Sequence, residues 1–170
     1  MQRVLRIAGV VIALAVVAGA CDSPTKPSGN PNVLSAQLLA VAVVPPATGT
    51  ETQGTGSATI TLQLTRDAGG TITSAAVDFQ VAVANLPAGT TLTEAHIHLG
   101  LPGVEGAVVV DTGLLQGEVT LAAGNGAFIK QNINIPATVG QELYSTPGNF
   151  YFDIHTVRNP SGVVRGQLSR

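Results

Sequence analysis

The sequence predicts an all-β fold, a Greek-key β-sandwich of about eight to nine antiparallel strands preceded by a signal peptide and a flexible tether. Three observations indicate this fold. From Val33 onward, short apolar runs recur roughly every ten residues and are separated by turn residues. No segment repeats apolar residues with the period of a long helix. Charged residues make up only 11% of the chain, whereas disordered chains are usually rich in charge.

Residues 1–20 have the parts of a signal peptide. Two arginines precede an apolar segment, residues 7–17, that is too short to cross a membrane. Small residues at 18–20 then lead to Cys21, the only cysteine, in an order that resembles the bacterial lipobox. We therefore expect cleavage before Cys21 and attachment of acyl chains such as palmitate through this residue, which would hold the protein to a membrane. The alternative is an ordinary signal peptide followed by an incidental free thiol.

Residues 21–32 are rich in Pro, Ser, Gly and Asn and have no apolar period, so we expect a flexible tether. Residues 33–170 then form the folded domain. The predicted location is the bacterial cell envelope, with the domain facing the periplasm or the cell exterior. The membrane would be a partner through the lipid anchor.

The first half of the domain contains three expected strands. Residues 34–44 form an apolar run that ends at Pro45-Pro46. Residues 57–65 alternate between apolar and polar side chains, as a half-buried strand does. Residues 67–70 (DAGG) predict a hairpin turn into a strand at 73–84. The side chains of this strand that we expect to face inward are those of Val77, Phe79, Val81 and Val83.

The second half adds six expected strands and one short helical turn at residues 136–143. The strands are expected at 93–99, 107–111, 117–121, 127–135, 149–157 and 163–168. The sequence NPSG at 159–162 predicts a turn between the last two. No internal repeat is evident.

Charge and cysteine content exclude several classes of protein. The net charge of −2 provides no basic surface, so we expect no nucleic-acid partner. A single cysteine excludes a disulfide within the chain. A lipid on Cys21 would also prevent its thiol from binding a metal.

Four segments resemble the CHRD domain, a family named after chordin and widespread in bacterial secreted proteins. They are 95–100 (AHIHLG), 106–110 (GAVVV), 151–156 (YFDIHT) and 159–168 (NPSGVVRGQL). Pro45-Pro46 followed by GTGSA at 54–58 is similar to the opening of the family pattern, and the resemblance extends over residues 38–168. It implies a β-sandwich in an exported bacterial protein, and no enzymatic activity is assigned to the family. The chain departs from the pattern at Val43, Asp153 and Val163, where the family has Glu, Asn and Glu.

The three histidines of the chain are the candidate functional residues. Because alternate residues of a strand share a face, His96 and His98 point the same way, and Ala95, Ile97 and Leu99 are expected to face the core. If the two histidine-bearing strands are neighbours, three imidazoles and one carboxylate converge.

In the second of these strands, Asp153 and His155 lie opposite the apolar face of Phe150, Phe152 and Ile154. Histidine is a common ligand of copper and zinc, and Asp153 could bind directly or orient a histidine. A metal site requires the imidazole nitrogens to lie within roughly 3–4 Å of a common point. The sequence itself specifies no cofactor beyond this suitability for copper or zinc.

The alternative for the histidines is a hydrogen-bonded structural cluster that ties the two strands together, with Arg165 paired to Asp153 or Glu94. Three functions therefore remain open. The favoured one is a non-enzymatic, lipid-anchored binding or structural module whose envelope ligand the sequence does not name. The second is an envelope metal-binding protein that uses His96, His98 and His155. A redox or hydrolytic enzyme is the third and is disfavoured, because no Ser or Thr lies in a nucleophile motif.

Overall fold

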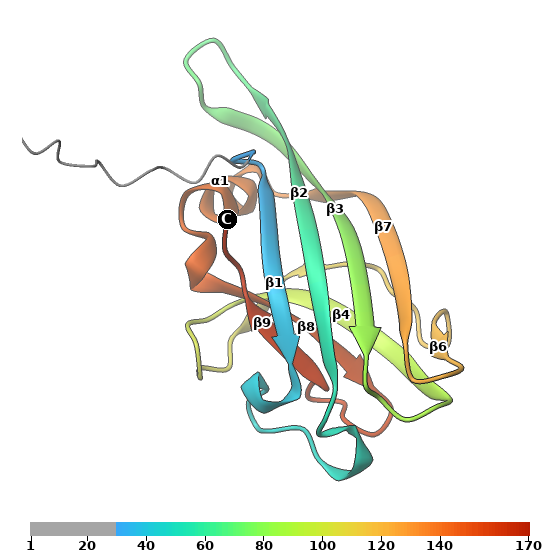
Figure 1. Ribbon diagram of the computed structural model, residues 1–170. Coiled ribbons are helices and arrows are strands. Elements are labelled where there is room, and N and C mark those ends of the chain that lie inside the picture. The colour runs from blue at the N-terminus through green and yellow to red at the C-terminus, as the bar shows by residue number, and fades with distance from the viewer. Residues whose placement is uncertain (1–29) are drawn as a thin grey trace, which may run out of the picture.

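The computed structural model describes residues 30–170, which form nine β-strands, one α-helix and three short 3₁₀ helices (Figure 1). The predicted signal peptide, Cys21 and most of the tether lie outside the described residues. The strands are β1 (Val33–Leu39), β2 (Thr55–Arg66), β3 (Ile72–Ala84), β4 (Thr90–Leu99), β5 (Ala107–Asp111), β6 (Thr120–Leu121), β7 (Gly126–Ile135), β8 (Phe150–Thr156) and β9 (Val164–Gln167). The helices are η1 (Ala40–Ala42), η2 (Gly49–Glu51), α1 (Ala137–Ser145) and η3 (Pro147–Asn149). Among these residues, no helix has the length and apolar character needed to span a membrane.

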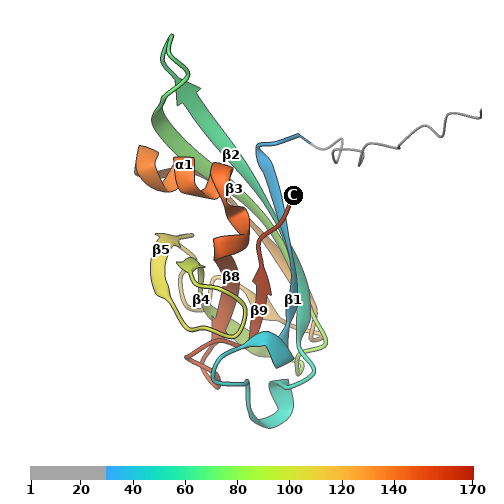
Figure 2. The same cartoon turned by 90° about the vertical axis from the view of Figure 1, so that its left-hand side faces the viewer.

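The strands form a folded sheet with the order β5-β4-β8-β9-β1-β2-β3-β7, and β6 pairs separately with β4. β1, β2, β3 and β7 make one layer, and β5, β4, β8 and β9 make the other (Figure 2). The layers join where β1 meets β9, through the pair Leu39↔Arg165 and the bridge Ser35↔Ser169. The chain crosses between layers three times, from β3 to β4, from β6 to β7 and from β7 to β8. This arrangement confirms the predicted all-β, sandwich-like fold.

The core lies between the two layers and is built by the alternation of the sequence. The predicted inward residues of β3 are buried, and the Phe79 ring lies 5.8 Å, centroid to centroid, from the ring of Phe152 in β8. Rings at this separation and tilted to each other pack favourably. Burial of the apolar side chains of β3 and β8 therefore holds the layers together and positions β8.

Helix α1 confirms the short helix predicted at 136–143. It covers one end of β2 and β3 (Figure 2). A Cβ atom at Gly140 would lie 2.5 Å from the Cβ of Ala75, so the helix packs directly on β3 only because this residue has no side chain. Leu143 is buried in the same contact. The helix thereby directs the chain into the start of β8.

Two strand predictions were too long. The strand expected at 34–44 ends at Leu39, because its partner in β2 begins opposite, at Thr55, and residues beyond Leu39 have no ladder partner. They continue as the 3₁₀ helix η1. The strand expected at 117–121 consists only of β6, because Gly117 adopts φ +86° and Glu118 N–H donates to the Leu115 carbonyl in a turn.

The loop that joins β4 to β5, residues 100–106, folds over the outer face of β4, β8 and β9. Its carbonyls at Leu101 and Val104 accept hydrogen bonds from Arg165, and Gly100 O accepts one from Gln167 Nε2. Every residue of β8 is consequently buried, including those on the face away from the core. Leu99, which was expected in the core, is 47% exposed because it is the last residue of β4 and begins this loop.

Candidate metal centre

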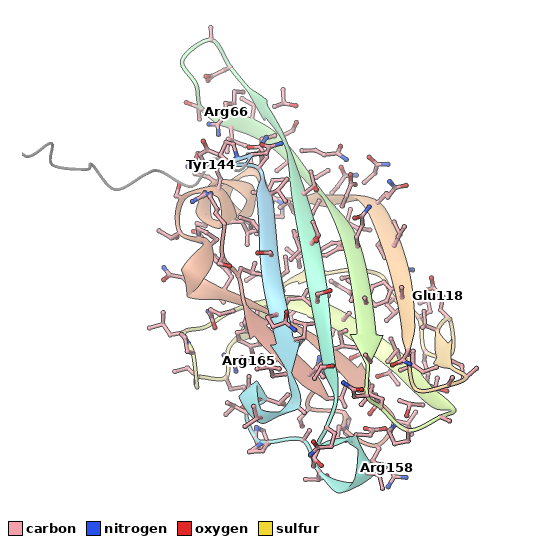
Figure 3. The ribbon with its side chains drawn as sticks, in the orientation of Figure 1. Arg66, Glu118, Tyr144, Arg158 and Arg165 are labelled. Atoms are coloured by element: carbon pink, nitrogen blue, oxygen red, sulfur yellow. The ribbon has the colours of Figure 1, made fainter. Side chains whose placement is uncertain are left out.

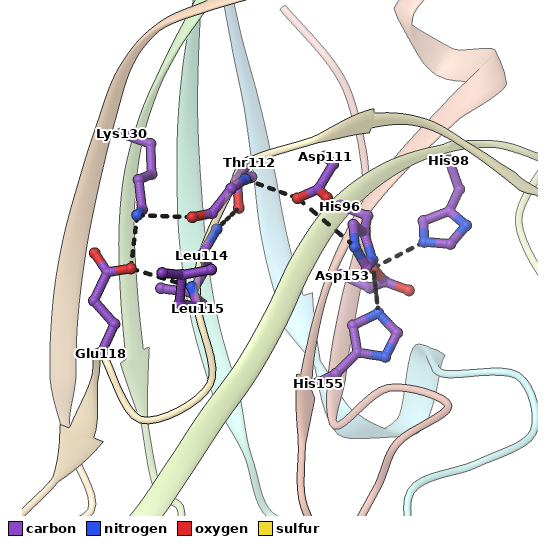
Figure 4. A network of polar contacts seen from close by, with 11 residues as sticks. His96, His98, Asp111, Thr112, Leu114, Leu115, Glu118, Lys130, Asp153 and His155 are labelled. Carbon is purple, nitrogen blue, oxygen red and sulfur yellow. Dashed lines mark hydrogen bonds and ion pairs between the residues drawn. The ribbon is translucent and has the colours of Figure 1, made fainter.

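β4 and β8 are neighbouring antiparallel strands, which satisfies the condition set by the sequence. His96 pairs with Asp153 across the two strands, and His98 pairs with Tyr151. With a side-chain period of two, this register places four polar side chains on one face: His96, His98, Asp153 and His155. Figure 4 shows these side chains directed toward one another.

The nitrogen and oxygen atoms of the four side chains lie at distances from one another close to those between ligands of one metal ion. His96 Nδ1 lies 3.2 Å from His155 Nε2, and Asp153 Oδ1 lies 3.1 Å from both His155 Nε2 and His98 Nε2. All four ligand atoms lie within 4.8 Å of one another. Zinc bonds of about 2.0–2.1 Å in a tetrahedron place ligand atoms roughly 3.3 Å apart. The cluster could therefore hold a metal ion if its longest separation shortened by up to about 1.5 Å.

Burial keeps bulk water away from the cluster. The four residues are 4–9% exposed, although they lie on the outer face of the sheet. The loop 100–106 covers part of this face. In surroundings of low polarity, charges and lone pairs interact more strongly than in water.

Two backbone carbonyls determine which nitrogen of each ring faces the centre. His98 Nδ1 donates to Gly106 O at 2.8 Å, and His155 Nδ1 donates to Pro160 O at 2.8 Å. A carbonyl oxygen accepts only, so Nδ1 carries the proton in both rings. The Nε2 atoms of the neutral rings then present lone pairs to the centre, as metal-binding histidines do.

The lone pairs of His98 Nε2 and His155 Nε2 face Asp153 Oδ1. This oxygen belongs to a carboxylate and is itself a hydrogen-bond acceptor. Two acceptors at 3.1 Å need a cation between them. A proton can serve between Asp153 and His155, where a hydrogen bond forms. His98 Nε2, although within ion-pair distance of Asp153, is buried without a hydrogen-bond partner in the described part of the chain.

Burial and the neighbouring charges have opposite effects on most of the pKa values in the metal-free cluster. Burial lowers the pKa of His98 and His155, but the hydrogen-bonding and charge of Asp153 outweigh it, so both pKa values are raised. Burial raises the pKa of Asp153, and the two imidazoles outweigh it and lower that pKa. Burial and the neighbouring His155 lower the pKa of His96. In the metal-free site Asp153 therefore keeps a proton on His98 and His155 to higher pH than on a free imidazole, and the two rings keep Asp153 ionised to lower pH.

Asp111 lies at the edge of the site and is not one of the four converging residues. Its Oδ1 is 4.0 Å from His96 Nε2, the nitrogen that faces away from the centre, and its side chain is 68% exposed (Figure 4). This carboxylate can orient His96 only weakly, because water screens it.

Tyr151 supports the cluster from β8. Its ring stacks on the His98 ring with centroids 4.7 Å apart, and the Arg165 guanidinium lies 3.4 Å from the centre of the tyrosine ring. Tyr151 Oη accepts a hydrogen bond from Gly106 N–H. The side chain therefore fixes the His98 ring and the covering loop together.

The predicted pairing of Arg165 with Asp153 or Glu94 is wrong. Arg165, labelled in Figure 3, lies on β9. Its Nη2 donates to Leu101 O at 3.0 Å and Val104 O at 2.9 Å. No carboxylate within residues 30–170 approaches Arg165 to ion-pair distance. The folded loop supplies these acceptors, and local sequence does not indicate its path.

A cavity of about 230 Å³ adjoins the cluster and gives a route to it. The residues that line it include three of the four cluster members together with Val43, Glu105, Tyr151, Ser161 and Arg165. A larger surface hollow of about 500 Å³ lies elsewhere, beside Thr90, Val157 and Arg158, and the converging histidines do not reach it.

Sequence reasoning missed a buried network that supports the Pro160 carbonyl. Glu51 Oε2 accepts hydrogen bonds from Thr156 Oγ1 at 2.7 Å and Asn159 Nδ2 at 2.6 Å. Asn159 Oδ1 in turn accepts from the Thr48 N–H group. These contacts join segments more than 100 residues apart, so only the NPSG turn signalled this region in the sequence.

The family model of the CHRD domain matches residues 34–168. Searches of curated proteins and of solved structures each found no match.

Proposed function

Because this chain belongs to the CHRD domain family, with nearly all of its described residues inside the domain, we propose that it is a non-enzymatic metal-binding module of the cell envelope. The ion is a divalent first-row transition metal, Zn²⁺ or Cu²⁺. His96 Nδ1, His98 Nε2, His155 Nε2 and an Asp153 carboxylate oxygen are its ligands.

The observation that carries this proposal is the buried Nε2 atom of His98. A structural cluster held by protons would give this nitrogen a hydrogen bond, since an unsatisfied buried polar atom costs about 1–3 kcal/mol. It instead lies 3.1 Å from Asp153 Oδ1 without a hydrogen bond in the described part of the chain, while Gly106 O holds the ring so that Nε2 faces this carboxylate. A metal ion at the centre would satisfy this lone pair and the acceptors opposite it.

The donor set favours zinc and copper over other ions. Three imidazoles and one carboxylate suit Zn²⁺ and Cu²⁺, whereas Mg²⁺ and Ca²⁺ prefer oxygen ligands alone. The second nitrogens of His98 and His155 are already bonded to carbonyls, which is the outer support typical of metal-binding histidines.

The direct test is uptake of metal by the purified full chain. The chain is kept in mild detergent, stripped with a chelator, and titrated with Zn²⁺ or Cu²⁺ while calorimetry and elemental analysis give affinity and stoichiometry. We expect one ion per chain. His98→Ala should remove tight binding, and Asp153→Asn should weaken it at least tenfold.

Asp111→Asn is the matched control, because it removes a nearby carboxylate that is not among the proposed ligands. It should change affinity less than threefold, in keeping with an exposed charge pair. Failure of the wild-type chain to bind either ion, or equal affinity in the Asp153 and Asp111 variants, would overturn the proposal. A purely structural histidine cluster is then the remaining interpretation.

The cell-envelope part of the proposal depends on Cys21. Small residues at 18–20 before the single cysteine, after a charged and apolar leader, support lipid attachment there. Metabolic labelling with palmitate should mark the wild-type protein. After cell fractionation, the wild-type protein should be found with the membranes. Cys21→Ser should be unlabelled and leave the membrane fraction, and a labelled Cys21→Ser protein would contradict the anchor.

A further inference from the structure

We infer that the cavity beside the metal centre binds a small carboxylate anion, held between the bound ion and the guanidinium of Arg165. This inference rests on the proposed metal-binding function and names the ligand class of the same site. Three properties of the cavity lead to it: an unneutralised buried cation, space next to the metal ligands, and a charge balance that changes when metal binds.

Arg165 is a buried cation without a carboxylate partner. The residue is 3% exposed, and its charge is not matched by any carboxylate at ion-pair distance in the described chain. Burial of an unpaired charge is costly, and stacking on Tyr151 offsets only part of that cost. An anion in the cavity would supply the missing charge.

Part of the guanidinium remains available to a ligand. Only Nη2 makes hydrogen bonds, to the carbonyls of Leu101 and Val104. Within residues 30–170, no acceptor bonds to Nη1 or Nε, and Arg165 lines the cavity. Guanidinium N–H groups bind carboxylate oxygens with strong, charge-assisted hydrogen bonds.

The cavity places this cation next to the metal ligands. His98, Asp153 and His155 line the same 230 Å³ space as Arg165. One water molecule occupies about 30 Å³, so the space can accept a small carboxylate. One carboxylate oxygen could bind the ion as a fifth ligand while the other accepts from Arg165.

A bound divalent ion adds two positive charges beside Arg165 and offers the anion an atom to coordinate. Without it, the fixed carboxylates of Asp153 and Glu105 oppose the single charge of Arg165. Carboxylate binding should therefore depend on metal, and Glu105 at the exposed rim should weaken it.

The test is titration of the Cu²⁺-loaded full chain with acetate, followed by visible absorption and electron paramagnetic resonance. Copper is used because it binds nitrogen and oxygen sites more tightly than zinc. We expect a saturable spectral shift, no acetate binding by the metal-free chain, and at least tenfold weaker binding in Arg165→Gln.

Because Arg165 also holds the loop, Glu105→Gln provides a variant that leaves the fold undisturbed. It should tighten acetate binding roughly two- to fivefold, and Glu142→Gln, an exposed change on α1, should have no effect. Copper uptake without any acetate response overturns this inference and leaves the metal-binding proposal intact. Unchanged acetate affinity in Glu105→Gln, or in a folded Arg165→Gln, also overturns it. Absence of copper uptake overturns both.

Discussion

Replacing Asp153 by asparagine in the metal-free protein tests the charge state of the histidine cluster. Asp153 Oδ1 lies 3.1 Å from the Nε2 atoms of both His98 and His155. The substitution keeps the shape of the side chain and removes its charge. Protonated His98 and His155 then lose the group that raises their pKa values, so the expected cost depends on pH.

The directions of the three pKa shifts determine how the stability of the fold changes with pH. The raised pKa values of His98 and His155 stabilise the fold fully below the unfolded value of 6.5, and this stability is lost as pH rises through the folded values. The lowered pKa of Asp153 contributes stability above its unfolded value of 3.8, and this is lost as pH falls through the folded value. The ion pairs therefore stabilise the fold most between these two limits.

The expected cost of Asp153→Asn is about 3 kcal/mol near pH 5.5, at the low end for removing one partner of a buried ion pair. It should fall to about 1 kcal/mol near pH 8.5, where neutral rings leave only an ordinary hydrogen bond to lose. For a domain of this size these costs correspond to falls in Tm of roughly 12 and 4 °C.

The assay is thermal and urea unfolding in the presence of a chelator, followed by circular dichroism at both pH values. Asp111→Asn should cost less than about 1 kcal/mol at either pH, because its carboxylate is exposed. A cost of Asp153→Asn that is the same at both pH values, or larger at the higher one, would refute the assigned charge state.

Three further substitutions test the fold around the site. Gly106→Ala should cost about 3 kcal/mol or more, because its Cβ would overlap the Leu99 carbonyl, and zinc affinity should fall at least tenfold as the support of the His98 ring shifts. Phe152→Ala should lower the free energy of unfolding by about 3–5 kcal/mol, measured with urea, because the ring is fully buried against the other layer. Glu51→Ala should cost about 3 kcal/mol in the same assay, because it leaves the Asn159 amide and a neighbouring hydroxyl without an acceptor.

Each of these substitutions has a control in the chain. Gly148→Ala should be nearly neutral, because a Cβ there meets nothing within 4 Å. Val108→Ala and Glu142→Ala change exposed side chains and should stay within about 0.5 kcal/mol of wild type. A substitution at Gly106, Phe152 or Glu51 that is as mild as its control would contradict the packing or hydrogen bonding described for that residue.

The sequence alone determined the class of fold and the faces of the individual strands. Alternation in β3 correctly identified Val77, Phe79 and the next inward residues, and the H-x-H spacing correctly placed His96 and His98 on one face. These inferences succeed because the side-chain period of a strand is local and needs no partner. The same reasoning failed where strands end, at Leu39 and Leu99, because strand length depends on the neighbouring strand.

Only the tertiary structure decided that the site exists and is buried. His96 and His155 are 59 residues apart, and their contact depends on β4 pairing with β8, a long-range choice that no local pattern encodes. The folded loop 100–106 then covers the polar face, turns Arg165 away from Asp153, and directs the Gly106 carbonyl to His98. Histidines that sequence placed on one strand face thus became a buried cluster able to hold a metal ion, because nonlocal backbone groups fix each ring.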